Sequence, residues 1–203
     1  MYNCHMKNDA SFTVFWSGDE VDLFDHVVGN NIIDCDERTS KPLEDMWGGG
    51  NLCDCIMVNN VFRNGGGSGL CVIRTPKRLI CASNSVHNGV VAGISMETGI
   101  ETVIANNVVR DCGGGGIKIP ASTHGEGNGC LIVGNVSRDN ADRGINAVGD
   151  NHIISNNFVY ANNLVGIEVS GSNCIVSGNI IKIMVEIPQH LQHFVEVSGL
   201  QML

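Results

Sequence analysis

The chain is built from a repeated unit, and this repeat restricts its fold more than any other feature. Seven segments of similar pattern, each containing an aligned asparagine, recur along most of the 203 residues. The asparagines are Asn31, Asn60, Asn84, Asn107, Asn135, Asn157 and Asn179, and they are separated by 29, 24, 23, 28, 22 and 22 residues. Units of this length are typical of a solenoid, in which each unit covers the hydrophobic face of the next.

A second marker divides each unit into a constant half and a variable half. In five successive units, from Asn60 to Asn157, a glycine followed by Ile or Leu stands nine residues after the aligned asparagine. These glycines are Gly69, Gly93, Gly116, Gly144 and Gly166. The distance from glycine to the next asparagine varies, at 15, 14, 19, 13 and 13 residues. Insertions confined to one half predict short rigid strands with one variable turn on a single side of the solenoid.

The segments after each glycine alternate as a pleated strand requires. Stacking successive units places Ile94, Ile117, Ile145 and Ile167 in one interior column, and it also stacks the asparagine amides about 4.8 Å apart. We therefore predict an all-β fold, a right-handed parallel β-helix of about seven coils with three short parallel sheets. A leucine-rich repeat is the alternative solenoid, but its framework requires leucine where this chain has mostly Ile and Val.

We expect the β-helix to span residues 1–184 and a C-terminal cap or tail to span 185–203. Tyr2–Phe15 resembles the later half of a coil, so the chain is expected to begin inside a coil and to be a fragment of a longer protein. Met1–Phe15 has no pattern of a secretory signal.

Composition narrows the classes of partner. The formal net charge of −9 disfavours nucleic acid and anionic membranes, and no run of 18 apolar residues predicts a membrane span. The nine cysteines include no paired CxxC motif, so we expect no metal site and interpret them as small interior side chains. His26 and His152 align with Cys55, Cys130 and Cys174, and we expect both in the interior as well.

The recurring V-x-x-N-N-x-V…G-I-x-V units resemble the right-handed β-helices of the pectate-lyase-like superfamily over residues 24–182. The resemblance is specific for the fold and not for one enzyme. It implies a polysaccharide partner, bound in a groove along one sheet between longer turns, and an extracellular or virion-associated location. It leaves calcium open as a cofactor.

The outward column of the Gly-Ile strands carries our catalytic candidates. Successive coils place Cys71, Ser95, Lys118, Asn146 and Glu168 there, with Arg143 and Arg74 beside them. Lys118 and Glu168 are catalytic candidates, together with Glu97, His124 and Glu126, whereas Asn146 and Arg143 are candidates for substrate binding. The loop 120–129 leaves the Lys118 strand and carries His124 and Glu126, while Glu97 lies one coil away. A neutral lysine among carboxylates and a histidine would suit removal of the proton next to a uronate carboxylate, as in β-elimination. The plainer interpretation is a solvated Lys118–Glu97 ion pair.

Hydrolysis instead needs two carboxyl groups about 5–9.5 Å apart. Glu97 and Glu168 are three coils apart, roughly 14 Å, which is too far. Glu97 and Glu126 are the remaining pair for this reaction.

A second outward column lies three residues after each asparagine. It contains Asp34, Arg63, His87, Arg110, Arg138, Tyr160 and Lys182. We interpret it as a binding surface for an acidic polymer, with Tyr160 as a stacking platform for a sugar. The alternative is a solvated face neutralised by the neighbouring Asp111 and Asp139.

Three functions follow. The first is a carbohydrate-active protein that acts on an acidic polysaccharide. Lyase-type cleavage is the favoured reaction, and hydrolysis and epimerisation are the other two. The second is a non-catalytic stalk or receptor-binding spike, which would be compatible with a trimer. The third is a passive fragment whose active coils lie outside this chain.

Overall fold

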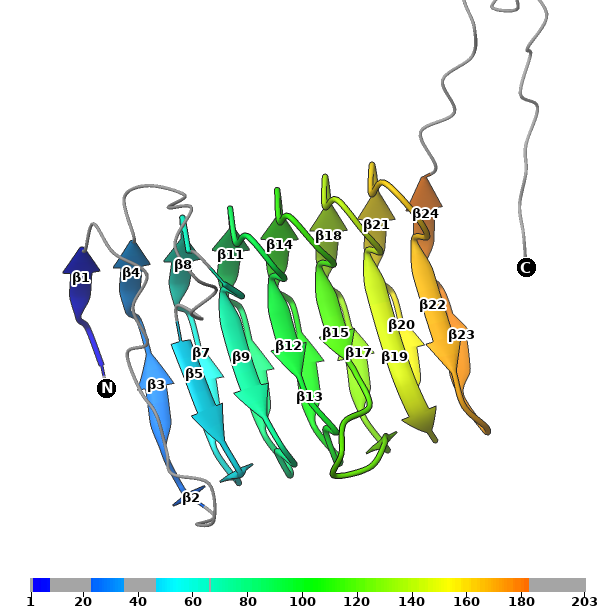
Figure 1. The fold of residues 1–203 in the computed structure, drawn as a ribbon, viewed down its shortest axis with the longest axis horizontal. Coiled ribbons are helices and arrows are strands. Elements are labelled where there is room, and N and C mark those ends of the chain that lie inside the picture. Colours follow the sequence, from blue (N-terminus) through cyan, green and yellow to red (C-terminus); the bar gives the residue numbers. More distant parts are fainter. Residues whose placement is uncertain (1, 8–22, 35–46, 66, 183–203) are drawn as a thin grey trace, which may run out of the picture.

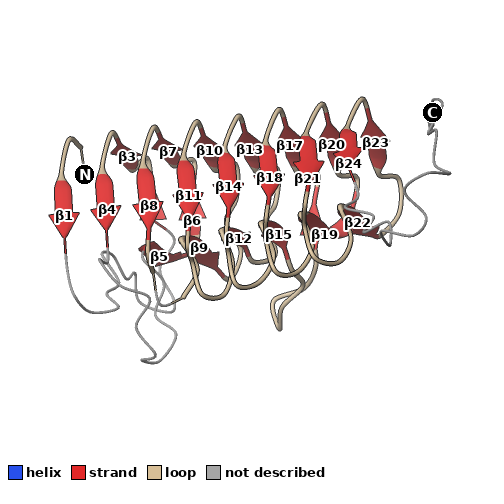
Figure 2. Ribbon diagram, turned by 90° about the horizontal axis from the view of Figure 1, so that it is seen from above, coloured by secondary structure: helices blue, strands red, loops and turns tan. Residues whose placement is uncertain are grey.

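The computed structural model describes residues 2–7, 23–34, 47–65 and 67–182. These residues form 24 β-strands and no helix. The chain winds through three parallel sheets in turn, so that each coil adds one strand to the edge of each sheet (Figures 1 and 2). The predicted β-helix and its three sheets are confirmed, whereas the predicted cap at 185–203 lies outside the described residues.

We name each sheet by its position in the repeat. The pre-Asn sheet consists of β3 (Val27–Gly29), β7 (Ile56–Val58), β10 (Ile80–Ala82), β13 (Val103–Ala105), β17 (Leu131–Val133), β20 (Ile153–Ser155) and β23 (Ile175–Ser177). The post-Asn sheet consists of β1 (His5–Lys7), β4 (Ile32–Asp34), β8 (Val61–Arg63), β11 (Ser85–His87), β14 (Val108–Arg110), β18 (Val136–Arg138), β21 (Phe158–Tyr160) and β24 (Ile180–Lys182).

The Gly-Ile sheet consists of β5 (Trp47–Gly50), β9 (Leu70–Ile73), β12 (Ile94–Met96), β15 (Ile117–Ile119), β19 (Ile145–Asp150) and β22 (Ile167–Ser170). The short β16 (Gly127–Asn128) pairs with the end of β19, and β2 (Leu23–Phe24) pairs with β6 (Leu52–Cys53). The predicted interior column is in register, because Ile94 pairs with Ile117, Ile117 with Ile145, and Ile145 with Ile167.

The turn between the pre-Asn and post-Asn sheets has the same two-residue design in every coil. The residue before each ladder asparagine has a left-handed φ, for example 54° at Asn106 and 66° at Gly134. Asn and Gly tolerate this conformation better than other residues. The next residue is the aligned asparagine, whose side chain enters the interior, and this alternation explains why the motif reads Asn-Asn or Gly-Asn in six coils. Ser83, with a φ of 56°, takes the left-handed position in the remaining one.

The buried asparagines form a continuous hydrogen-bonded ladder. Asn84 Nδ2 donates to Asn107 Oδ1 at 3.0 Å and to the Met57 carbonyl at 3.0 Å, while Asn84 Oδ1 accepts the side-chain and backbone N–H groups of Asn60. The same pattern continues to Asn179. Every ladder amide between Asn60 and Asn157 is thus satisfied on both sides, so these polar groups are buried without an unpaired donor or acceptor.

Six of the eight described cysteines are buried, and one of them, Cys71, belongs to the outward column of the Gly-Ile sheet. Cys4 and Cys174 are half-buried, so the prediction of interior positions holds for most of the cysteines and not for all. Cys53, Cys55, Cys71, Cys81, Cys112 and Cys130 are buried and none of the described cysteines forms a disulfide. Burial raises the pKa of the Cys81 thiol to about 12 and that of Cys130 to about 11. Such thiols remain protonated and unreactive at neutral pH.

The two aligned histidines differ. His152 is fully buried, accepts the Cys130 N–H at Nδ1 over 3.2 Å, and places Nε2 3.3 Å from the Val148 carbonyl. Burial lowers the pKa of His152, which is a neutral core residue. His26 is exposed, so the prediction of an interior position is wrong there. It directly precedes β3, which is the last strand at its end of the pre-Asn sheet.

Candidate functional site

Lys118 lies at the centre of a charged network on the outer face of the Gly-Ile sheet. It is in register with Asn146, which is in register with Glu168, as the repeat predicts. Lys118 Nζ lies 3.8 Å from Asp142 Oδ2, and the same carboxylate lies closer to Arg143 Nη1, at 3.0 Å. Lys118 is therefore the most loosely held cation of the network.

Glu168 closes the network on its other side. It forms an ion pair with Arg143 and accepts a 2.6 Å hydrogen bond from Asn146 Nδ2. The hydrogen bond with Glu168 raises the pKa of the Arg143 guanidinium. Arg143, Asn146 and Glu168 are thus brought together, whereas only Lys118 keeps a single long contact.

Local sequence makes room for Lys118. The run Gly113–Gly116 precedes β15, and a Cβ at Gly115 would collide with Lys118 Cε. The lysine side chain therefore lies back over the glycine run and is 26% exposed.

Asp142 was missed in the sequence, although the repeat contains a signal for it. It stands two residues before Gly144, where other coils have Gly67, Val91, Gly114 and Leu164. A charged residue in a column of glycine and aliphatic residues stands out as an outward-facing exception.

Glu97 does not pair with Lys118. Its carboxylate accepts the backbone N–H of Arg74 at 2.8 Å, where it stabilises the end of the preceding coil's strand. Arg74 has a φ of 70°, and a side-chain acceptor satisfies its N–H in this turn. Glu97 is thus engaged in a structural contact, and the expected Lys118–Glu97 ion pair does not form.

The loop 120–129 is held at the opposite end of the Gly-Ile strands from Asp142. Ser122 and Gly125 exchange backbone hydrogen bonds, and Thr98 Oγ1 lies 2.7 Å from Ser122 Oγ. His124 and Glu126 are exposed on this loop, and no hydrogen bond or ion pair joins either of them to Lys118. The structure therefore does not gather all five catalytic candidates into one cluster.

The outward column of the post-Asn sheet is in register over its whole length. Asp34 pairs with Arg63, Arg63 with His87, His87 with Arg110, Arg110 with Arg138, Arg138 with Tyr160, and Tyr160 with Lys182. This cationic column is the longest run of basic and aromatic side chains that the described coils bring together. Its spacing is one side chain per coil, about 4.8 Å.

Carboxylates accompany the arginines of the cationic column. Arg63 Nε donates to Asp34 at 2.7 Å, and Arg110 and Arg138 form ion pairs with Asp111 and Asp139, the residues that follow them. His87 lies between Arg63 and Arg110, and burial together with the two arginine charges lowers its pKa. At neutral pH the column therefore carries its charge on arginine and lysine.

Aromatic rings extend the cationic column at its C-terminal end. The centroids of Phe158 and Tyr160 are 4.5 Å apart, with the rings inclined by 35°. Arg138 lies 6.0 Å from the centroid of Tyr160, and Lys182 Nζ lies 5.5 Å from that of Phe158. Cations and ring faces thus alternate here, which suits a ligand with both anionic and flat apolar parts.

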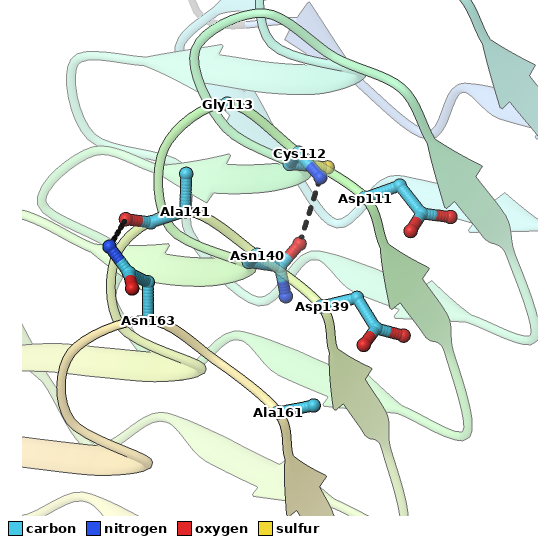
Figure 3. Close-up of a pocket in the computed structure, with 8 residues that line it drawn as sticks. All are labelled: Asp111, Cys112, Gly113, Asp139, Asn140, Ala141, Ala161 and Asn163. Atoms are coloured by element: carbon cyan, nitrogen blue, oxygen red, sulfur yellow. Dashed lines mark hydrogen bonds between the residues drawn. The ribbon is translucent and has the colours of Figure 1, made fainter. Parts of the chain in front are cut away.

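A pocket of about 470 Å³ lies where the post-Asn strands turn toward the Gly-Ile strands (Figure 3). It is lined by Asp111, Cys112, Gly113, Asp139, Asn140, Ala141, Ala161 and Asn163. Asn140 Oδ1 accepts the Cys112 N–H, and Asn140 Nδ2 donates to Asn162, so a second, shorter amide ladder supports the pocket. The carboxylates of Asp111 and Asp139 point to the same side, from equivalent positions of adjacent coils (Figure 3).

The same turn connects the two candidate surfaces. Asp139 lines the pocket and pairs with Arg138 of the cationic column, while Asp142, three residues later, holds Lys118. Four of the predicted binding residues therefore lie on a different sheet from Lys118, across one turn, namely Arg63, Arg110, Arg138 and Tyr160. The other two, Arg143 and Asn146, lie beside Lys118.

The described donors do not fit a calcium ion. No group of three or more His, Cys, Asp or Glu side chains in the described coils is arranged to hold a metal. The neighbouring carboxylates Asp111 and Asp139 are each engaged by an arginine. The described part of the chain also has no helix long and apolar enough to span a membrane.

Comparison with known proteins agrees with this architecture. Residues 2–158 match the family model of the right-handed β-helix region, and the chain belongs to this family. No curated protein matches the sequence.

Among solved structures, two mutants of the periplasmic alginate epimerase AlgG are similar. The first has a TM-score of 0.63 at 13% identity over 89% of this chain, and the second has a TM-score of 0.54 at 14% identity over 76%. The chain spans about half of these proteins, 48% and 46% of their lengths. At such identities the likeness establishes the fold.

Proposed function

We propose that this chain acts on an acidic polysaccharide, which lies along the cationic column. The observation that carries the proposal is the register of Arg63, His87, Arg110, Arg138, Tyr160 and Lys182, one per coil. The repeat of a linear pyranose chain is close to the spacing of stacked strands. Neighbouring sugar carboxylates would thus meet the guanidinium groups of Arg110 and Arg138, which lie in adjacent coils, and sugar faces would lie on the rings of Phe158 and Tyr160.

The aspartates beside the column are compatible with this binding mode. Arg110 and Arg138 are each paired with the carboxylate of the following residue at a partly exposed site. Such an ion pair contributes little in water, so a polymer carboxylate in bidentate contact replaces it at small cost. Asp111 and Asp139 would then hold the arginines in position while no ligand is bound.

We propose lyase-type cleavage as the reaction, with Lys118 as the base for a uronate at the point where the polymer crosses the 139–144 turn, from the cationic column to the Gly-Ile sheet. In β-elimination the proton next to the uronate carboxylate passes to the lysine amine, a carbon–carbon double bond forms, and the bond to the leaving glycosidic oxygen breaks. The leaving oxygen takes a proton from solvent. Lys118 suits this role because its contact with Asp142 is long, 3.8 Å, and Asp142 is already bonded to Arg143. Arg143 and Asn146 would position the uronate carboxylate.

The similar solved structures agree with the substrate class. Their name, alginate epimerase, describes an enzyme that acts on an acidic polysaccharide. Inversion of a uronate carbon also begins with removal of the proton next to the carboxylate, so epimerisation is the neighbouring reaction that the same residues would support. A protein of this kind would meet its substrate outside the cytoplasm or on a virion.

One assay tests both levels of the proposal. The chain is incubated with a panel of polyuronides, with and without calcium, and unsaturated products are followed by ultraviolet absorbance. We expect product from at least one polyuronide, and we expect Lys118→Ala to abolish it without changing binding measured by calorimetry. The matched control is Lys77→Ala, a lysine outside both surfaces. Binding without product from any polyuronide would overturn the lyase step, and absence of binding would overturn the substrate class.

The alternative function is a non-catalytic β-helical stalk or receptor-binding spike. The observation that favours it is the pairing of almost every charge on the two surfaces, which a passive face would also show. A stalk predicts neither product nor polyuronide binding, and no effect of Lys118→Ala in any assay except stability.

A further inference from the structure

The outer face of the pre-Asn sheet is apolar along all seven coils. Its first outward column consists of Val27, Ile56, Ile80, Val103, Leu131, Ile153 and Ile175. Five of these side chains are among the most exposed large hydrophobic residues of the described chain, from 37% for Ile56 to 54% for Ile175. They form a continuous ridge parallel to the solenoid axis, because the strands are paired in register.

The second outward column of the same strands is shallower. It consists of Gly29, Val58, Ala82, Ala105, Val133, Ser155 and Ser177. In each of these seven coils this side chain is smaller than its partner two residues earlier, so a lower column, which we call the groove, lies beside the ridge. Tyr2 pairs with Gly29 and continues this column at its N-terminal end, where its ring packs over the glycine.

This face carries no charged residue, unlike the other two sheets. None of its 14 outward positions is Asp, Glu, Lys, Arg or His, although the chain contains 21 Asp or Glu residues and 12 Lys or Arg residues. A contiguous exposed apolar surface of this kind usually marks a site of protein association. A charged or sugar ligand would find no partner here.

We propose that this face binds a second copy of the chain in a parallel, two-fold symmetric dimer. Rotation by 180° about an axis parallel to the solenoid exchanges the two columns, so the ridge of each copy faces the groove of the other. Rotation about an axis across the solenoid would instead place ridge on ridge. The shape of the face is therefore self-complementary only when the two solenoids run in the same direction, which is an isologous contact.

The flanking turns agree with this arrangement. One edge of the face carries the charged turn residues Asp25, Asp54, Arg78 and Glu101, and the other carries the uncharged turn residues Asn30, Asn59, Ser83 and Asn106. The parallel rotation places the charged edge of each copy opposite the uncharged edge of its partner. Like charges therefore do not meet across the interface, despite the net charge of −9.

The size of the face predicts a weak dimer. Seven strands about 4.8 Å apart and three residues wide give a surface about 30 Å long and 10 Å across. The two copies would bury on the order of 600–1,000 Å² in total, below the roughly 1,200 Å² of standard stable interfaces. We therefore expect association in the micromolar range or weaker, driven by apolar contact. The proposal does not depend on the proposed function.

Sedimentation equilibrium of the chain over a wide concentration range tests the dimer. We expect a monomer–dimer equilibrium, and we expect Ile80→Lys on the ridge to weaken it by at least tenfold. The control is Val108→Lys on the post-Asn sheet, a β-branched strand residue with a similar exposure of 38% against 41% for Ile80. Circular dichroism confirms that both variants are folded. A monomer at all concentrations, a trimer, or equal effects of the two variants would overturn the proposal.

A second pair of variants separates ridge-in-groove fit from simple hydrophobic adhesion. Filling the groove with Ala82→Leu and Ala105→Leu adds apolar surface while it removes the space for the partner's ridge. We expect the double variant to dimerise more weakly than the natural chain, by about tenfold. Stronger dimerisation would show that the face is merely adhesive and would overturn the ridge-in-groove dimer.

The parallel orientation is tested by cross-linking two different variants. In a background with Cys4→Ser, Cys35→Ser and Cys174→Ser, a chain with Ile80→Cys is mixed with a chain with Ala82→Cys and a short bis-maleimide is added. We expect the mixed dimer to cross-link faster than either variant alone. Faster cross-linking within one variant would overturn the parallel arrangement.

Discussion

The outer faces of the pre-Asn and post-Asn sheets are opposite in character, although one repeat builds both and only the asparagine turn separates them. The pre-Asn face has an aliphatic ridge with no charge, whereas the post-Asn face has a column of arginine, histidine, tyrosine and lysine. Inside the turn the two sheets share the same asparagine ladder and the same aliphatic core. The difference teaches that stacking constrains the inward positions and leaves the outward ones free to acquire separate roles.

The largest effect is expected where both faces depend on one residue. Asn107→Ala removes the acceptor for the side-chain and backbone N–H groups of Asn84 and the donor to the Cys81 carbonyl. A buried unpaired polar group costs about 1–3 kcal/mol, so the free energy of unfolding should fall by about 4 kcal/mol. Urea denaturation measures it. Asn163→Ala removes an exposed amide and should cost less than about 0.5 kcal/mol; a loss below about 1 kcal/mol for Asn107→Ala would refute the ladder's importance.

A smaller effect distinguishes the inward from the outward positions of the pre-Asn sheet. Ile104 is fully buried, and Ile80, on the neighbouring strand, is 41% exposed. Ile104→Ala should lower the free energy of unfolding by about 3 kcal/mol, and Ile80→Ala by less than about 1 kcal/mol. Thermal and chemical denaturation at low protein concentration, where the chain is monomeric, give both values. Equal losses would mean that the outward ridge is part of the monomer's core.

The two outer faces should also respond differently to a polyuronide. Arg110→Ala or Arg138→Ala should each lower its affinity about tenfold, which is the loss of one charge-assisted contact of about 1.4 kcal/mol. Asp111→Asn should raise the affinity, because it frees Arg110. Calorimetry at fixed salt measures these changes. The matched control is Arg78→Ala, an arginine paired with Asp54 at an edge of the pre-Asn sheet, which should leave the affinity unchanged.

The smallest expected effect is that of acidic pH on the free energy of unfolding. Burial lowers the pKa of His152, and burial with the charges of Arg110 and Arg63 lowers that of His87. Both groups have an unfolded pKa of about 6.5, so below that pH the unfolded chain binds protons that the folded chain does not. The contribution of these two histidines to the free energy of unfolding should be complete above about pH 6.5. It should be lost as the pH falls below about 6.5 and through the folded pKa values.

His152→Cys provides the matched test of this pH dependence. Cysteine occupies the same interior position at Cys55 and Cys130, so the variant should fold and should lose part of the decline at acidic pH. His124→Ala, at an exposed site, should keep all of it. An unchanged slope in His152→Cys would show that this histidine does not contribute.

Much of the interior was predictable because the same pattern of inward-facing residues recurs in every unit of the repeat. The asparagine spacing and the constant step to glycine predicted the three sheets, the ladder and the column of Ile94, Ile117 and Ile145. The outward columns were also predictable as alignments, since parallel strands without bulges keep their register. Position within a column follows directly from counting residues.

Contacts between outward side chains were not predictable in the same way. Counting residues placed Glu97 near Lys118, but Glu97 accepts the Arg74 N–H, and Lys118 reaches Asp142 in a turn that belongs to no strand. A long side chain selects among several partners by rotamer and by the shape of the glycine run beneath it. The aligned repeat shows that Asp142 is unusual but not where its carboxylate points.

By itself the sequence determined the coil, because the asparagine turn, the left-handed residue before it and the alternating apolar strands admit one way of stacking. Only the tertiary structure decided which outward side chains contact one another and which are kept apart. It separated the cationic column from Lys118 by one turn, formed the pocket from Asp111 and Asp139 of adjacent coils, and left side chains of the pre-Asn ridge exposed among the described coils. The physical reason is that interior positions are set by hydrogen bonds and close packing repeated in every coil, whereas exterior contacts depend on single side chains in turns of unequal length.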